Sequence, residues 1–171
     1  MQIRRHHLIE EAKAELDVVY EEVKRAENQL FELEYDYDAR IAAVRSANGA
    51  MMTERIEDLI VDRDARKDRI DVPTLYRLEK AALERFSILT AAFSTVCVTA
   101  NPDEAAEKLG AIVFRPGELD KAGDEVKRAL RSFVEHLRAY TTHDASGEND
   151  RMVRESWTLI ENTLRGFGRA I

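Results

Sequence analysis

Residues 9–44 carry apolar side chains at alternating steps of three and four residues, and this pattern constrains the fold more than any other feature of the chain. A spacing that averages three and a half residues keeps one face of a helix turned toward a partner helix along its whole length. The sequence therefore predicts a long N-terminal helix, from about Ile3 to Ser46, that packs lengthwise. Arg40 is the exception in the stripe, and we expect it to reach solvent or to pair with Asp36. The stripe consists of Ile9, Ala12, Leu16, Val19, Val23, Ala26, Leu30, Leu33, Tyr37 and Val44.

Turn and proline signals divide the rest of the chain into five further helices. Asn48-Gly49 tolerates a left-handed backbone and ends the first helix. Pro73 ends the second, because the residue before a proline avoids helical geometry and proline has no amide hydrogen to donate. The predicted ranges are 51–70, 74–100, 102–110, 118–140 and 150–167, with 111–117 as a buried, extended connector.

These patterns predict an all-α fold, an elongated antiparallel helical bundle with a long, coiled-coil-like N-terminal helix. The length of 171 residues suits a single domain, 1–171, with a helical hairpin over 3–70 and bundle helices over 74–171. Few glycines and prolines, seven and three, favour helices over a β-rich fold. The run from Phe86 to Ala100 is apolar nearly all round, which predicts a helix at the bundle centre. It is shorter than the roughly 20 apolar residues that span a bilayer.

Charge and cysteine content narrow the functional classes. The formal net charge of -7 argues against a general nucleic-acid binder, which needs clustered cations to displace counterions from phosphate. The single cysteine, Cys97, excludes an internal disulfide, and its apolar surroundings in the sequence predict a buried, inert thiol. The first residues lack the apolar core of a signal peptide, so we expect a cytoplasmic protein.

The sequence offers no pattern for a metal ion or a cofactor. It contains neither the Glu-x-x-His pairs of ferritin-like bundles nor the His-Glu-x-x-His of zincins. The adjacent His6 and His7 point to different sides of a helix and cannot converge on one ion. The glycines are scattered singly, and none forms a phosphate-binding loop. We therefore expect no metal and no cofactor.

The acidic run Glu32–Asp38, ELEYDYD, has two interpretations. On a helix its carboxylates spread round the axis, which favours a solvated face over a cation site. The alternative is a docking surface for a basic partner, since Tyr35 and Tyr37 lie among the acids and tyrosine is enriched at protein interfaces.

Two segments have the spacing Arg-x4-His: Arg131 with His136, and Arg138 with His143. This spacing is similar to the signature of HEPN-type helical ribonucleases. The resemblance implies metal-independent RNA cleavage, in which the imidazole moves a proton and the guanidinium neutralises developing charge at the phosphate. Within one helix five residues place side chains about 140° apart, so the first pair cannot act together in one chain. The second pair is at a predicted helix end and is the better candidate.

The length of the first helix favours a different function. About 44 residues at about 1.5 Å each outreach every other predicted helix, so part of the stripe lacks an intramolecular cover. Bare apolar stripes of this size bind partners. We therefore predict a non-enzymatic protein-interaction or assembly subunit, either a homo-oligomer or part of a larger complex, with no membrane or nucleic-acid partner. The predicted interface residues are Ile9, Leu16, Val19, Val23 and Leu30.

Overall fold

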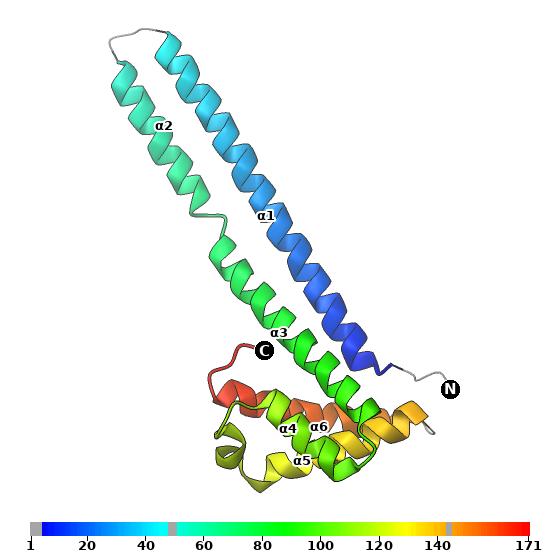
Figure 1. Cartoon of the computed structure of the whole chain (residues 1–171). Coiled ribbons are helices and arrows are strands. Elements are labelled where there is room, and N and C mark those ends of the chain that lie inside the picture. Colours follow the sequence, from blue (N-terminus) through cyan, green and yellow to red (C-terminus); the bar gives the residue numbers. More distant parts are fainter. Residues whose placement is uncertain (1–4, 48–50, 143–144) are drawn as a thin grey trace. The chain divides into compact units, whose positions relative to one another are not determined.

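The computed structural model describes residues 5–47, 51–142 and 145–171, and these parts of the chain form six helices without a strand. The all-α fold and the long N-terminal helix are confirmed, and Figure 1 shows the order of the elements. The expected start at Ile3 lies outside the described residues. The helices are α1 (His7–Ser46), α2 (Met52–Lys67), α3 (Val72–Val98), α4 (Pro102–Val113), α5 (Glu118–Thr142) and α6 (Gly147–Gly166).

Several predicted boundaries differ from the structure: α2 ends at Lys67 rather than at 70, α3 begins at Val72 rather than at 74, and α6 begins at Gly147 rather than at 150. The largest change in interpretation concerns the end of α4. The segment 111–117 was expected to be a buried, extended connector, but residues 111–113 belong to α4; Phe114 after it has an extended backbone, and only Val113 and Phe114 of the segment are buried. Val113 is fully buried, so this last turn continues the apolar face of α4 into the core. The start of α4 follows its capping signal, because the Asn101 side chain accepts hydrogen bonds from the amides of Asp103 and Glu104.

The chain divides into two compact units, and the division falls inside α1 and α3 rather than in a loop. Residues 1–16 and 80–171 form the first unit, here called the bundle unit. Residues 17–79 form the second, here called the hairpin unit. Helix prediction alone places domain boundaries at turns, and a helix shared by two units gives no such signal.

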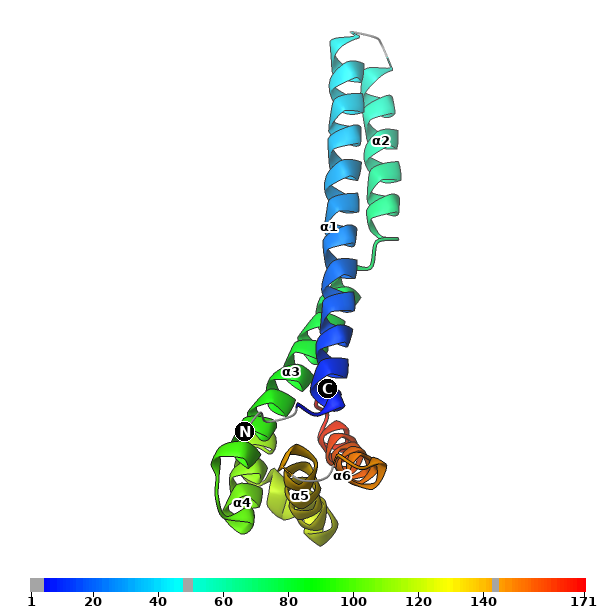
Figure 2. The same ribbon diagram turned by 90° about the vertical axis from the view of Figure 1, so that its right-hand side faces the viewer.

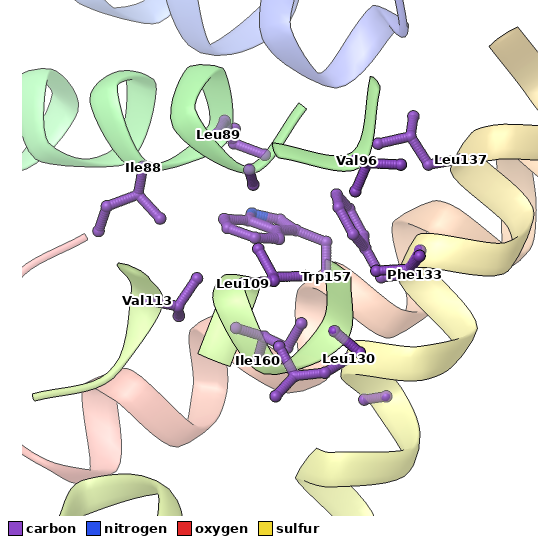
Figure 3. Close-up of a cluster of buried hydrophobic side chains, with 14 of the residues drawn as sticks. Ile88, Leu89, Val96, Leu109, Val113, Leu130, Phe133, Leu137, Trp157 and Ile160 are labelled. Atoms are coloured by element: carbon purple, nitrogen blue, oxygen red, sulfur yellow. The ribbon is translucent and has the colours of Figure 1, made fainter. Parts of the chain in front are cut away.

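The core of the bundle unit lies around Trp157 of α6. Its ring is 1% exposed and its centroid lies 5.3 Å from that of Phe133 on α5. Figure 3 shows these two rings among apolar side chains of α3 and α4, including Leu89 and Leu109. At Gly110 of α4, a Cβ would lie only 2.9 Å from a methyl carbon of Leu119 on α5, so the glycine leaves room for this leucine. Leu8 and Ala12 of α1 belong to the same cluster, so five helices contribute to one apolar core.

A buried carboxylate joins three helices of the same unit. Glu161 on α6 is 6% exposed and accepts hydrogen bonds from the Trp157 indole and from Arg85 on α3, the latter at 2.7 Å. Arg85 also donates to Glu15 on α1 at 2.8 Å. Because each buried polar group has a partner, the desolvation cost of placing Glu161 in the core is offset.

The C-terminal half of α3 differs from its prediction. Ile88, Leu89 and Val96 are buried, but the helix also has an open face on which Leu83 and Val98 are 51% and 80% exposed. It is therefore not a central helix covered on all sides.

By length and composition alone, a window within the helical stretch Met52–Val98 is apolar enough to cross a membrane, and 28% of that window is buried.

In the hairpin unit, α2 lies beside α1 and runs in the opposite direction, as Figure 1 and Figure 2 both show. Val23, Ala26 and Tyr37 of the stripe are buried, which confirms that it is a packing face, and Ile41, which the predicted stripe did not include, is buried as well. No residue of α2 is buried: Met52, Ile56, Leu59 and Ile60 are half-buried, and Val61 is 68% exposed. Along α2, where the hairpin consists of two helices, the seam between them is only partly covered.

Candidate functional site

The structure corrects one of the predicted interface residues. Val23 is only 3% exposed, so it is covered within one chain and does not need a partner. Ile9 is half-buried and packs on the core of the bundle unit. The remaining three, Leu16, Val19 and Leu30, are half-buried too. The helices after α1 therefore cover more of the stripe than the comparison of helix lengths allowed.

Tyr37 has the most developed set of contacts in the hairpin unit. Its side chain is fully buried, and its hydroxyl donates a hydrogen bond to Asp62 of α2. This bond raises the pKa of the phenol and lowers that of the carboxyl. The guanidinium carbons of Arg40 and Arg66 lie 4.7 and 5.8 Å from the ring centroid. The docking hypothesis for Tyr37 is therefore wrong, since the ring belongs to the seam.

The predicted pairing of Arg40 is confirmed. Its guanidinium lies 3.6 Å from the Asp36 carboxylate while it also covers the Tyr37 ring. Tyr20 has a similar arrangement, because the Lys24 ammonium lies 4.3 Å from its centroid and 3.8 Å from Glu21. In both cases an aromatic ring has a cation on it, and that cation pairs with a neighbouring carboxylate.

Two aromatic side chains on α1 lack such a cover. Phe31 and Tyr35 are 71% and 73% exposed, and their spacing of four residues places them on one face of the helix. Tyr35 was among the residues considered for docking, whereas Phe31 was not predicted. The periodicity did indicate that Phe31 is exposed, because it directly follows the stripe residue Leu30 and therefore lies off the packing face.

The carboxylates around these rings differ in their partners. Glu34 accepts a hydrogen bond of 2.6 Å from Lys67 of α2, which lowers the pKa of the Glu34 carboxyl. Glu27 accepts one from the Tyr76 hydroxyl. Among the described residues, no cation lies within ion-pair distance of Glu32 or Asp38. The acidic run is thus only partly neutralised by the rest of the chain.

A second polar cluster lies at the start of α1, in the bundle unit. The Nδ1 of His6 accepts a hydrogen bond of 3.2 Å from the Leu8 amide and so caps the helix. Its ring is 1% exposed and stacks at 4.6 Å on Tyr140, and its Nε2 lies 3.1 Å from Asp150. Burial lowers the pKa of His6 to about 4, so the imidazole is neutral at pH 7.

Arg154 extends this cluster to α1. It makes two hydrogen bonds of 2.8 Å to the two carboxylate oxygens of Glu11, and it also pairs with Asp150 at 3.1 Å. The bidentate bond lowers the pKa of the Glu11 carboxyl. This arrangement holds two helices together and leaves the imidazole enclosed, which suits a structural role better than proton transfer to a substrate.

The ribonuclease candidates have other partners. Arg138 donates to the carbonyl oxygen of Ala100 at 2.8 Å and to that of Thr99, beyond the C-terminal end of α3. It also lines a surface hollow of about 430 Å³. His143 lies outside the described residues.

The two residues of the first pair have different surroundings. Arg131 is exposed, whereas His136 is half-buried with its Nδ1 2.9 Å from Asn149 Oδ1. The catalytic role of the Arg-x4-His spacing stays a prediction.

The thiol of Cys97 is half-buried rather than fully buried, and burial raises its pKa, which disfavours the nucleophilic thiolate. Within residues 5–47, 51–142 and 145–171, no group of three or more His, Cys, Asp or Glu side chains could hold a metal ion.

Comparison of the chain with protein-family models, with curated proteins and with solved structures gives no match.

Proposed function

We propose that this protein is a non-enzymatic helical subunit that binds other protein chains through its hairpin unit. The observation that carries the proposal is the pair Phe31 and Tyr35, which are 71% and 73% exposed on one face of α1. Exposed aromatic residues are costly in water and are enriched at protein interfaces. The bundle unit offers a contrast, because its aromatic residues Phe133 and Trp157 are buried.

The open seam of the hairpin unit supports the same proposal. Leu30 and Leu33 of α1 and Leu59 and Ile60 of α2 are all half-buried, and no residue of α2 is buried. Two antiparallel helices become independently stable when further helices cover such a seam. A partner that covers these side chains would gain about 25 cal/mol for each Å² of apolar surface removed from water.

Photo-crosslinking in the full chain tests the proposal. A photoreactive phenylalanine derivative replaces Tyr35 or Val61 in the hairpin unit, or Glu125 in the bundle unit as an exposed control. We expect adducts in the cell from the hairpin positions and not from Glu125, with mass spectrometry identifying the adduct as a second copy or another protein.

Sedimentation of the purified chain completes the test, since a free monomer has a mass of 19.6 kDa. A monomer that also gives no adduct at either hairpin position would overturn the proposal.

A further inference from the structure

The hairpin unit carries most of the net negative charge of the protein. Residues 17–79 contain 16 acidic and ten basic side chains, a surplus of six acids, whereas the formal net charge of the whole chain is -7. The cations near the seam are already engaged, since Arg40, Arg66 and Lys67 pair with Asp36, Asp62 and Glu34. The excess acidic side chains of this unit therefore have no basic side chain of the seam to pair with.

This surplus lies beside the two exposed rings. Glu32 and Asp38 flank Tyr35 at three residues on either side, and an α-helix places such neighbours next to one another. Neither carboxylate has a cation within ion-pair distance among the described residues. A ring and an unpaired carboxylate thus stand side by side on the surface.

The same unit shows what complements this combination. The Tyr20 and Tyr37 rings have a cation four and three residues further along α1, Lys24 and Arg40, and each cation pairs with a carboxylate as well as covering the ring. At the corresponding positions after Phe31 and Tyr35, the chain has acidic, aromatic or small residues instead. Within the described part of the chain no cation covers either ring, so both are open to a cation of a partner.

We infer that Phe31 and Tyr35, with Glu32 and Asp38 beside them, form a docking surface for a basic helical segment of another protein. This inference rests on the proposed interaction function and specifies the chemistry of the partner. An arginine of that segment stacks on a ring while its guanidinium pairs with the neighbouring carboxylate, as Arg40 does on Tyr37 and Asp36. A second copy fits less well, because its hairpin unit brings the same surplus of carboxylates.

Fluorescence anisotropy with a defined probe tests the inference on the full chain. The probe is a labelled amphipathic peptide of about 18 residues, or about five helical turns, with arginine at every fourth position among alanine and leucine. Its control has glutamate in place of each arginine. At physiological salt we expect the arginine peptide to bind and the glutamate peptide not to bind.

Variants assign the binding to the surface. F31A/Y35A should weaken binding of the arginine peptide by about tenfold, since two cation–ring contacts are lost. The conservative F31Y/Y35F should bind as the unmodified chain does. E32Q/D38N should weaken binding by about threefold to tenfold, whereas E125Q/E135Q removes the same charge from exposed positions of α5 and should leave binding unchanged.

Several outcomes would overturn the inference. Absence of binding, equal binding of both peptides, or equal loss in E32Q/D38N and E125Q/E135Q would each exclude a specific basic docking surface. Self-association that F31A/Y35A abolishes, with no binding of the arginine peptide, would identify a second copy as the occupant and leave the proposed interaction function intact. If the proposed interaction function itself is wrong, the crosslinking experiment gives no adducts at positions 35 and 61 and sedimentation gives a monomeric mass.

Discussion

The bundle unit and the hairpin unit are made of similar amphipathic helices, but they bury their apolar side chains to different degrees. In the bundle unit, side chains from α3, α4, α5 and α6 meet round Trp157, and the largest of them are fully buried. In the hairpin unit, α2 has no buried residue, and ion pairs such as Lys67 with Glu34 line the seam. The comparison shows that an apolar stripe forms a closed core only where several helices converge on it.

The largest expected effect compares truncation in the two units. Trp157→Ala should lower the free energy of unfolding by about 4 kcal/mol, because it leaves a cavity in a closed core and removes the hydrogen bond to Glu161. Leu59→Ala on α2 should cost only about 1 kcal/mol, because this side chain is half-buried already. Urea denaturation followed by circular dichroism measures both. Equal losses would show that the two units are equally well packed.

The second prediction concerns acid. The folded-state pKa of His6, about 4, lies below its unfolded value of 6.5, so the unfolded chain binds the proton more readily between these values. His6 therefore contributes full stability above pH 6.5, and about 3 kcal/mol is lost as the pH falls toward 4. The stability difference between the unmodified chain and His6→Asn, which keeps a capping acceptor but does not titrate, should change with pH in that window. A constant difference in urea midpoints would contradict the prediction.

A smaller effect separates a structural from a catalytic Arg138. Arg138→Ala should cost about 1–2 kcal/mol, because the carbonyl oxygens of Thr99 and Ala100 lose their donors. Cleavage of single-stranded RNA by the purified chain, without added metal, tests the alternative directly. Activity that disappears in both Arg138→Ala and His143→Ala while both variants stay folded would establish the ribonuclease hypothesis and refute a purely structural arginine.

The smallest effect is local to the hairpin unit. Tyr37→Phe removes the hydrogen bond to Asp62 but keeps the ring under Arg40. Amide hydrogen exchange in residues 55–67 should become several-fold faster, while exchange in residues 126–137 of the bundle unit stays unchanged. Acceleration in both segments would mean that the two units unfold together.

The fold was largely predictable because helical periodicity is a local signal. The stripe of α1 and the Asn101 cap each depend on neighbouring residues, and both predictions agree with the structure. Pro73 marked the helix boundary only approximately, because α2 already ends at Lys67 and α3 begins at Val72, one residue before the proline. The open face of α3 was not predictable, because composition shows that Leu83 and Val98 are apolar but not whether another helix covers them. Ion pairs between residues far apart in the sequence, such as Arg85 with Glu161, cannot be predicted from residue spacing either.

The candidate surface was predictable only in part. The acidic run and Tyr35 were visible as an alternative to a solvated face, but the sequence could not separate the buried Tyr37 from the exposed Tyr35 by composition. The stripe already placed Tyr37 on the packing face, so periodicity carried that information. That no described cation lies over the Phe31 ring could be recognised only once the positions of all neighbouring side chains were known.

The placement of Trp157 has a practical consequence. It is the only tryptophan of the chain and lies at the centre of the bundle unit, whereas Tyr20, Tyr35, Tyr37 and Tyr76 belong to the hairpin unit. Selective excitation of the indole therefore reports on one unit, and tyrosine absorbance reports mainly on the other. The molecule carries two intrinsic optical probes, so the melting of each unit can be followed in a single unlabelled sample.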